Sequence, residues 1–385
     1  MRALAIVDGE HYPDVVREAL SELPYEFVGA MLVGGTEKLR GAPDYGVPLR
    51  DAPGDAEIAV DLSDEPVLDP RRRLLLASRF LAAGIPYVGA DFRFDPPTFH
   101  PFERPSLAVL GTGKRVGKTA VTGHAARLLA RDRRVVVVAM GRGGPAQPEL
   151  VESPPTLEDL VALSRRGRHA ASDHLETAVL ARVPTVGCRR AGGGLAGAPY
   201  TSNVLEGARL AASLDPDVVV FDGSGAAIPP IAAGARILVA HDLTSGLNAY
   251  RALISDLVLA PSDEAAAEAQ ALGRPVLRFE LRLRPAEPLA GRRVALFTTG
   301  PAPFGHLDAD VVFASRSLAD RTALAAELRT VDAEVFLVEL KAAAVDVVVE
   351  AALQRGAAVV LADNEVVADG LDEAILALVP AEVRA

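Results

Sequence analysis

Cysteine is nearly absent from this chain: Cys188 is the single cysteine among 385 residues, and tryptophan is missing altogether. A lone cysteine excludes an intramolecular disulfide and a zinc site built on several thiolates. No hydrophobic run approaches the roughly 18 residues that a membrane-spanning helix needs, and the N-terminus lacks the long apolar region of a signal peptide. We therefore expect a soluble, cytoplasmic protein with no membrane partner, and an unreactive thiol at Cys188.

An excess of basic residues is also missing. The 51 Asp and Glu residues outnumber the 40 Lys and Arg residues, which leaves a net charge of −11 at pH 7. Non-specific binding to nucleic acids or to anionic membranes depends on a basic face. We therefore expect no nucleic-acid partner, and any anionic ligand must meet a local group of cations.

Hydrophobic residues make up 50% of the chain, enough for the cores of two or three domains. Short Val, Ile and Leu runs alternate with amphipathic stretches, the pattern of parallel strands joined by helices. Strands are expected at 3–7, 57–60, 86–89, 107–110, 135–140, 218–222, 237–240, 257–260, 294–298, 311–314, 334–338 and 358–362. We predict an α/β protein whose three domains are an N-terminal Rossmann-like domain (1–98), a central domain with a mainly parallel sheet flanked by helices (99–285), and a C-terminal α/β domain (286–385).

The most specific motif is Gly111-Thr-Gly-Lys-Arg-Val-Gly-Lys-Thr119, which follows an apolar run and precedes a helix-like stretch. A glycine-rich turn at a helix N-terminus points backbone N–H groups at a phosphate, whereas the alternative is an ordinary glycine turn before a surface helix. Lys118 is expected to reach the β- and γ-phosphates of ATP, and Thr119 to ligate Mg²⁺. The expected ATP-binding residues of this P-loop are Gly111, Thr112, Gly113, Lys114, Arg115, Val116, Gly117, Lys118 and Thr119.

A second informative feature is the apolar run that ends in Asp222 and continues as Gly-Ser-Gly. Ligand sites in parallel sheets lie outside the carboxyl ends of the strands, where the glycine-rich loop also lies. We therefore expect Asp222 to hold Mg²⁺ together with Thr119. The alternative is an aspartate that only caps the following turn.

The loop spacing, with Thr112 where the usual pattern has its first glycine, resembles the dethiobiotin synthetase-like branch of P-loop proteins. Three further motifs make all three blocks similar to the cyclic 2,3-diphosphoglycerate synthetase family: Asp8-Gly-Glu-His-Tyr-Pro13, Gly141-Arg-Gly-Gly-Pro145 and Phe221-Asp-Gly-Ser-Gly-Ala-Ala-Ile-Pro-Pro230. The resemblance implies an ATP-dependent ligase that closes an intramolecular phosphoanhydride in 2,3-diphosphoglycerate, with release of ADP and phosphate. It also implies a homodimer. That family usually has glutamate where this chain has Asp222, one methylene shorter.

The implied substrate carries about five negative charges near neutrality, so it needs a cationic pocket, and the planar fork of arginine suits phosphate oxygens. Arg142 follows a predicted strand and is expected to face the P-loop. The expected catalytic residues are Lys118, Lys114, Arg115 and Arg142. The expected substrate contacts are Arg142, Gly143, Gly144, Arg189, Arg190, Gly223, Ser224, Gly225 and His11.

Several of these interpretations have alternatives that the sequence leaves open. The segment Arg189–Gly197 is either a second anion-binding loop or a disordered surface loop with solvated arginines. His11 suits a capping or packing role as well as a substrate contact. Arg71–Arg73 most simply form a solvated helix face.

Three other functions are compatible with a P-loop. A switch ATPase would use nucleotide to control a partner surface, and a dethiobiotin synthetase-like ligase would select an amine or carboxylate substrate. A phosphoglycerate kinase-type phosphotransferase would leave the transferred phosphate on its product. The dense set of cations favours the phosphorylated substrate over the amine.

Overall fold

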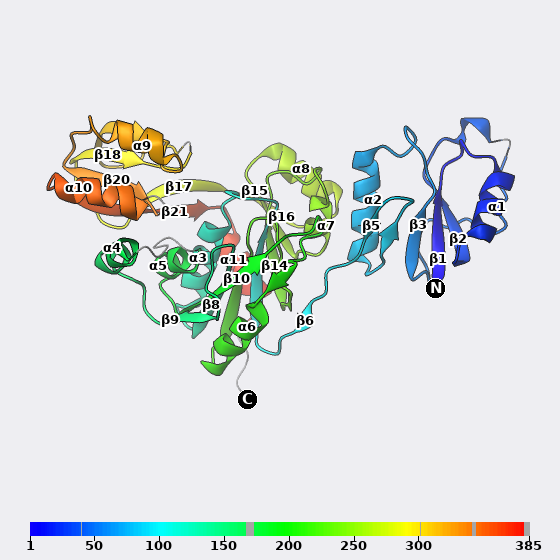
Figure 1. The fold of residues 1–385 in the computed structure, drawn as a ribbon, viewed down its shortest axis with the longest axis horizontal. Coiled ribbons are helices and arrows are strands. Elements are labelled where there is room, and N and C mark those ends of the chain that lie inside the picture. The colour runs from blue at the N-terminus through cyan, green and yellow to red at the C-terminus, as the bar shows by residue number, and fades with distance from the viewer. Residues whose placement is uncertain (40, 167–172, 301, 341–343, 381–385) are drawn as a thin grey trace.

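The computed structural model describes residues 1–39, 41–166, 173–300, 302–340 and 344–380. Figure 1 shows three lobes in a row, each built on its own β-sheet, which we call the N-terminal, central and C-terminal lobes. The predicted fold class is confirmed, since the molecule is α/β with a mainly parallel central sheet and two smaller α/β units. Within the described residues, no helix has the length and apolar character needed to cross a bilayer.

The N-terminal lobe holds a five-stranded sheet that is parallel except at its β5 edge. In sheet order its strands are β2 (Glu26–Leu32), β1 (Arg2–Val7), β3 (Ile58–Asp61), β4 (Tyr87–Val88) and β5 (Arg93–Phe94). The helices are α1 (Pro13–Glu22) and α2 (Pro70–Ala82). Proline at the first helical position starts both helices, and the Asp69 side chain caps α2 by accepting from the Arg72 N–H.

The central lobe contains a nine-stranded sheet whose middle strands are buried along their whole length. In sheet order its strands are β11 (Thr201–Ser202), β10 (Thr185–Ala191), β8 (Val135–Gly141), β12 (Val218–Asp222), β7 (Ser106–Gly111), β14 (Ala235–Val239), β15 (Leu257–Ala260) and β16 (Val276–Arg278), and β9 (Glu149–Val151) pairs with β10. Its helices are α3 (Lys118–Leu129), α4 (Leu157–Arg165), α5 (Asp173–Ala181), α6 (Val204–Ser213), α7 (Asn248–Leu253) and α8 (Asp263–Ala271). Because helices cover both faces, the middle strands are continuous apolar runs.

The C-terminal lobe contains a five-stranded sheet with one antiparallel edge strand. In sheet order its strands are β17 (Glu280–Pro285), β21 (Ala358–Val367), β20 (Val335–Glu339), β18 (Arg293–Phe297) and β19 (Asp310–Ser315). The α-helices after β18 are α9 (Arg321–Glu327), α10 (Glu350–Gln354) and α11 (Leu371–Leu378). A short two-stranded pairing, β6 (His100–Pro101) with β13 (Ile231–Ala232), lies outside these sheets.

The central lobe packs against both of its neighbours. Helix α2 of the N-terminal lobe packs on α7, and Leu160 of α4 shares an apolar cluster with Leu340 and Val349 of the C-terminal lobe. Helix α11 returns to the central lobe, where Ile375 is buried in the same cluster as Val121 of α3. The boundary expected at 285/286 stays a prediction, but the third sheet already includes β17 and the last helix packs on the P-loop helix.

The expectation of a solvated face at Arg71–Arg73 is wrong for Arg73. Its Nε donates to Asp61 Oδ2 at 2.8 Å, and its Nη2 donates to the Ser63 carbonyl at 2.8 Å. Asp61 also accepts from the Tyr87 hydroxyl at 2.6 Å. Burial raises the pKa of Tyr87, so its hydroxyl stays a donor. A charge that sequence patterning places in solvent is therefore part of a largely buried network under the N-terminal sheet.

Asp61→Asn is expected to destabilise the N-terminal lobe by about 2 kcal/mol, because it leaves the Arg73 guanidinium with only the exposed Glu65 carboxylate, 4.0 Å away, as a counter-charge. Urea unfolding followed by far-UV circular dichroism measures the change. Asp95→Asn is the matched control, since Asp95 pairs with Arg93 at 2.8 Å while both side chains are about half exposed. That exposed pair should contribute less than about 1 kcal/mol. Equal losses in the two variants would contradict the prediction.

Candidate active site

The loop between β7 and α3 has the geometry expected of a P-loop. Gly117 adopts φ +97° at the start of α3, and no side chain caps the helix N-terminus. A Cβ atom on Gly111 would lie 2.7 Å from Lys118 Cδ, so the missing side chain leaves room for the lysine stem. The first N–H groups of α3 are therefore available to an anion.

Lys118 is buried at the base of this loop, with 8% of the residue exposed. Its Nζ donates to the Gly113 carbonyl at 3.4 Å, within the same loop. A hydrogen bond of this length is weak, so the ammonium group gives up little free energy when it turns from the carbonyl to a phosphate. The structure thus places Lys118 in the P-loop as predicted, and Lys114 and Arg115 are exposed at its rim.

Asp222 ends β12, between strands β7 and β8. It is 4% exposed, and its Oδ1 accepts from the Thr122 hydroxyl at 3.1 Å. Burial raises the pKa of the Asp222 carboxyl to about 7, with Lys118 opposing this rise. The negative charges of Asp173 and Glu176, in the first turn of α5, raise the pKa further.

Sequence reasoning missed Thr122, Asp173 and Glu176. Thr122 lies one helical turn after Thr119, on the same side of α3. This spacing is the one sequence signal from which Thr122 could have been predicted. Asp173 and Glu176 are far from the P-loop in the chain, and α5 carries them to it by packing against α3 and β8. A Cβ atom on Gly141 would lie 2.7 Å from Asp173 Oδ2, so this carboxylate lies against the end of β8.

The stability of the metal-free protein should carry a contribution from Asp222 that falls as pH rises. The folded-state pKa of about 7 exceeds the ordinary 3.8, so the folded protein keeps a proton that the unfolded chain loses. This stabilisation is complete below the ordinary pKa and is lost as pH rises through about 7. Relative to Asp222→Asn, which cannot titrate, the wild type should lose up to about 4 kcal/mol over this range. Thermal unfolding from pH 4 to 8 measures it, and parallel profiles would contradict it.

The residues present fit a magnesium ion. A threonine hydroxyl and one carboxylate are the oxygen donors that Mg²⁺ accepts when phosphate oxygens and water complete its octahedron. Thr119 and Asp222 are the residues of these types expected here, and the threonine hydroxyl that contacts Asp222 in the structure is that of Thr122. No group of three or more His, Cys, Asp or Glu side chains suited to a metal exists in the described part of the chain. A site here would therefore depend on bound phosphate as well as on protein.

The side chains of three basic residues, from the P-loop, from the end of β8 and from β10, approach the turn after β12. Gly225 adopts φ +60°, and a Cβ atom there would lie 3.0 Å from Arg142 Nη2, 3.5 Å from Arg190 Nη2 and 3.9 Å from Lys114 Cγ. Arg190 is fixed by donating to the carbonyls of Gly192 at 2.6 Å and Ser224 at 2.8 Å. We call Lys114, Arg142 and Arg190 the basic cluster.

Among the residues that the structure describes, the basic cluster has no acidic partner at ion-pair distance. No member forms an ion pair with any described residue, whereas arginines such as Arg2, Arg73, Arg134 and Arg284 do form ion pairs. Burial lowers the pKa of Arg190, and the charge of Arg142 lowers it further. The charge of Asp173 opposes this lowering, but no carboxylate among the described residues forms an ion pair with the cluster. Cations grouped in this way favour an anionic ligand.

The segment from Arg189 to Gly197 is partly strand and partly ordered turn. Arg189 and Arg190 belong to β10, and alternation places Arg190 inside and Arg189 on the exposed side. The turn is closed by a hydrogen bond from Gly194 N–H to the Ala198 carbonyl, and Gly197 O accepts from Ile228 N–H at 2.8 Å. The alternative of a disordered loop is therefore wrong, and Arg189 lies outside the basic cluster.

The expected glycine contacts have different surroundings. A Cβ atom on Gly144 would lie 2.0 Å from the Cys188 carbonyl oxygen, so this glycine permits packing on β10, whereas Gly143 has open space around it. Gly223 donates to the Val109 carbonyl at 3.0 Å, and Ser224 forms a bridge with Ala227 beside the basic cluster. Thus the structure brings Ser224 and Gly225 to the cations and assigns Gly144 to packing.

Cys188 is buried in β10, with 1% of the residue exposed. Burial raises the pKa of its thiol to about 12, and the charge of Glu206 adds to this rise. The neighbouring arginines do not activate it, so the thiol suits packing against Gly207.

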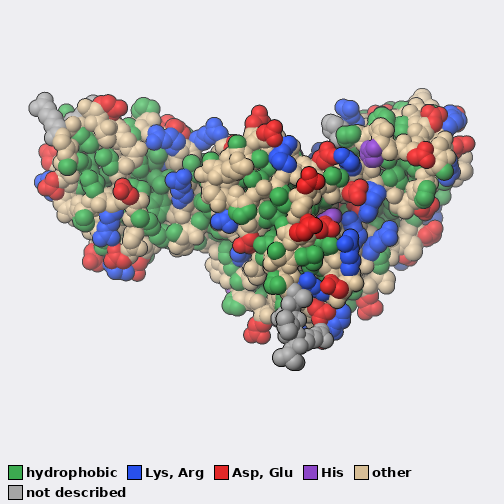
Figure 2. Space-filling view, turned by 180° about the vertical axis from the view of Figure 1, so that it is seen from behind, with side chains coloured by type: hydrophobic (Ala, Val, Ile, Leu, Met, Phe, Trp, Pro, Cys, Tyr) green, Lys and Arg blue, Asp and Glu red, His purple; other side chains and the backbone are tan. Residues whose placement is uncertain are grey.

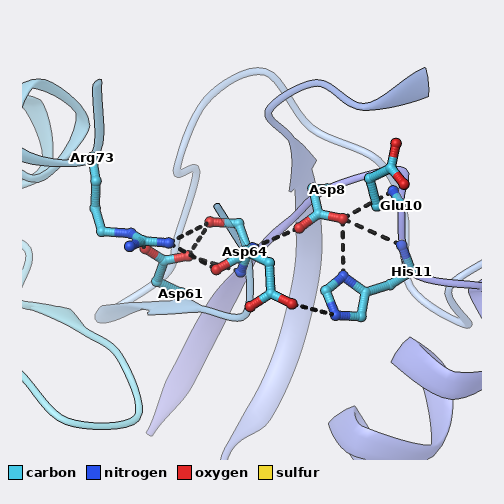
Figure 3. Close-up of polar contacts among 7 residues, drawn as sticks. Asp8, Glu10, His11, Asp61, Asp64 and Arg73 are labelled. Atoms are coloured by element: carbon cyan, nitrogen blue, oxygen red, sulfur yellow. Dashed lines mark hydrogen bonds and ion pairs between the residues drawn. The ribbon is translucent and has the colours of Figure 1, made fainter. Parts of the chain in front are cut away.

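His11 lies in the N-terminal lobe, apart from the basic cluster. Figure 3 shows the polar residues that surround it. Its Nδ1 lies 2.9 Å from Asp8 Oδ1, and its Nε2 lies 3.4 Å from Asp64 Oδ2. The buried Asp8 carboxylate also accepts from the backbone N–H groups of Glu10, His11 and Asp64. These contacts fit the capping interpretation, and a substrate contact at His11 stays a prediction.

Three family models match the chain in order. They are described as the N-terminal domain of cyclic 2,3-diphosphoglycerate synthetase (residues 2–57 and 52–95), its P-loop domain (106–273) and its C-terminal domain (285–365). The P-loop match covers the nine-stranded sheet and α3. The structural expectation of a P-loop domain is therefore confirmed.

Relatives named cyclic 2,3-diphosphoglycerate synthetase match over nearly their whole length. The protein from Rubrobacter xylanophilus is 47% identical, with 100% of this chain and 98% of the relative covered. That from Thermococcus kodakarensis is 41% identical, with 96% of each covered, and that from Methanothermus fervidus is 36% identical, with 98% and 96% covered. Models across all three lobes and full-length similarity to named synthetases lead to one conclusion: this chain is an enzyme of the cyclic 2,3-diphosphoglycerate synthetase family.

Proposed function

We propose that this protein closes an intramolecular phosphoanhydride in 2,3-diphosphoglycerate with ATP as the second substrate, releasing ADP and inorganic phosphate. The observation that supports the proposal is the basic cluster, whose side chains approach the turn at Gly225 and form no ion pair with any described residue. A bisphosphorylated acid supplies the missing negative charge. The names of the relatives support the same substrate.

The P-loop is proposed to hold the ATP phosphates through backbone N–H groups at the start of α3. Lys118 would leave the Gly113 carbonyl and stabilise the charge on the transferring phosphoryl group. Thr119 and Asp222 would hold Mg²⁺, which neutralises charge on the phosphate oxygens when bound. Ionised Asp222 is required for this role, so Thr122 has a supporting part as its hydrogen-bond donor.

The basic cluster is proposed to bind the two phosphates of the substrate. One substrate phosphate oxygen attacks the γ-phosphorus, which breaks its bond to ADP and yields a terminal pyrophosphate. An oxygen of the neighbouring phosphate then attacks the inner phosphorus of that pyrophosphate, and inorganic phosphate leaves. The attacking oxygens are already deprotonated, so the reaction needs no general base. Because both groups belong to one molecule, effective molarities of about 10⁵ M or more favour closure.

Arg190 and Arg142 have different roles in this proposal. Arg190 is fixed by two carbonyl groups and holds the turn at Ser224, so it orients the site. Arg142 is exposed and has no described ion-pair partner, so its fork is available for phosphate oxygens. A homodimer is the assembly proposed from family resemblance, and light scattering on the purified protein tests it.

³¹P NMR of the purified protein with Mg-ATP and 2,3-diphosphoglycerate tests the reaction. A cyclic pyrophosphate signal should grow in step with ADP and inorganic phosphate, and no ATP should be consumed without the substrate. Formation of 2,3-diphosphoglycerate from a monophosphoglycerate, without any cyclic product, would instead indicate the kinase-type reaction. ATP hydrolysis that ignores both metabolites would reject the synthetase reaction and favour a switch ATPase.

A further inference from the structure

A cavity of about 280 Å³ lies between the central and C-terminal lobes, outside the active site described above. It is lined from α3 and the end of α5 on one side and from β17, β21 and the start of the following turn on the other. Figure 1 shows α3 and α5 on one side of β17 and β21. In Figure 2, basic side chains gather over the junction of these two lobes, with acidic ones among them.

Three arginines and one carboxylate line this cavity. Arg284 Nη2 lies 2.8 Å from Asp363 Oδ2, and Arg127 Nη1 lies 3.3 Å from the same oxygen. Arg182 forms no ion pair with a described residue. We call Arg127, Arg182, Arg284 and Asp363 the interlobe cluster.

The interlobe cluster carries unbalanced positive charge. Burial lowers the pKa of Arg127, and repulsion by Arg284 and Arg182 lowers it further, against the attraction of Asp363 and Glu365. Asp363 is the one carboxylate in the lining and is shared by two guanidinium groups, while Arg182, an exposed residue of the lining, forms no ion pair with a described residue. A bound anion would offset this repulsion.

Asp363 also has an unused acceptor. Its side chain is 12% exposed, and its Oδ1 is buried without a hydrogen-bond partner, while Oδ2 receives both arginines. A buried carboxylate oxygen without a donor costs about 1–3 kcal/mol. Because Oδ1 itself is inaccessible to solvent, it can accept from a ligand only after the carboxylate turns toward the cavity. A ligand that fits would be anionic and would carry an O–H group.

Arg182 has a backbone conformation that favours glycine, so the presence of arginine there suggests a role for its charged side chain. Arg182 directly follows α5 and adopts φ +56°, a left-handed conformation in which glycine is preferred. Any residue with a Cβ atom costs about 1 kcal/mol there. Glycine at this position would relax the backbone but would remove the unpaired cation from the cavity.

We propose that the interlobe cluster binds a singly protonated phosphate group, either as inorganic phosphate or as a phosphomonoester. Arg127, Arg182 and Arg284 supply the cations, and the Asp363 carboxylate, turned toward the cavity, accepts the P–O–H hydrogen bond. Sulfate, which has no proton to donate near neutrality, is the discriminating anion. Because Arg127 lies on the helix that begins at Lys118, the bound group would join the P-loop helix to the C-terminal sheet.

The test is isothermal titration of the full chain with sodium phosphate in a phosphate-free buffer at low ionic strength. Arg182→Gly should weaken one class of sites by at least about 10-fold while raising the melting temperature, which separates ligand binding from a folding defect. Arg131→Gln, at an exposed arginine just beyond α3, should leave this class of sites unchanged. Lys118→Ala should retain this class of sites, because the residues of the interlobe cluster lie outside the P-loop.

Selectivity gives a second readout. Wild-type protein should bind sulfate at least about 10-fold more weakly than phosphate, and Asp363→Asn should reduce that preference. Titration with glycerol phosphate distinguishes the sources, since tight binding of the ester indicates a phosphomonoester and its rejection indicates inorganic phosphate. Unchanged phosphate binding in Arg182→Gly, or equal sulfate and phosphate binding in the wild type, would overturn the proposal.

Discussion

Replacing Lys118 with alanine is expected to lower the rate of ATP consumption by on the order of 10³-fold. Lys118 is the buried cation of the P-loop and is held by a long hydrogen bond to Gly113. Its charge is needed most when negative charge spreads over the transferring phosphoryl group, so its loss falls mainly on kcat. Release of ADP in the presence of 2,3-diphosphoglycerate, measured with a coupled assay, gives the value.

Arg131→Ala is the control for this experiment, because Arg131 lies just beyond the same helix with 73% of its side chain exposed. It should retain wild-type rates. Far-UV circular dichroism and the melting temperature show whether Lys118→Ala is folded. A folded Lys118→Ala protein with more than about a tenth of the wild-type rate would remove this lysine from the mechanism.

Replacing Arg142 with glutamine should reduce kcat/KM for 2,3-diphosphoglycerate by about 10²- to 10³-fold, while the KM for ATP changes little. Arg142 is exposed, lies next to Gly225 and Arg190, and has no described counter-ion. Losing a charge-assisted, bidentate contact to phosphate costs several kcal/mol when the pocket is already short of anions. The substrate whose kinetic constants change more in this variant is the one that Arg142 contacts.

Arg142→Lys is the matched variant, because lysine keeps the charge but not the planar fork. We expect it to recover part of the lost kcat/KM. Steady-state kinetics with each substrate varied in turn separate the two cases. An equal rise in both KM values would mean that Arg142 shapes the whole site, and would count against a specific phosphate contact.

Helix α3, which begins at the P-loop, is in contact with elements from the C-terminal part of the chain. Helix α3 carries Lys118 and Thr122 at one end, Arg127 near the other, and packs on both β21 and α11. His124 in the middle of α3 lies 2.6 Å from Asp372 of α11. The P-loop helix is thus held by elements from the C-terminal part of the chain, although its own motif is complete without them.

Local features could be predicted from the sequence because neighbouring residues decide them. The P-loop needs a strand, a glycine-rich turn and a helix in succession, and all three are contiguous at 106–129. The apolar run before Asp222 likewise predicts its position at the carboxyl end of a strand. In both cases the backbone geometry follows from residues a few positions apart.

Strands with mixed composition escaped prediction. Strand β10 contains glycine at 187 and two arginines, and β17 alternates Leu281 and Leu283 with charged residues at the edge of its sheet. Their apolar runs are too short to distinguish them from loops. They form strands because a neighbouring strand supplies hydrogen bonds and a face to bury.

The chain's sequence by itself determined the α/β class, the P-loop and the carboxylate at Asp222, since each depends on local pattern. Tertiary structure alone decided which distant charges meet: Arg142 and Arg190 reach Gly225 because β8 lies between β10 and β12. It likewise brought Arg127 of the central lobe to Asp363, which already pairs with Arg284 between β17 and β21 of the C-terminal lobe. Sheet order and lobe packing bring together residues that lie between 35 and 236 positions apart. The periodicity of apolar residues along the chain does not predict such contacts.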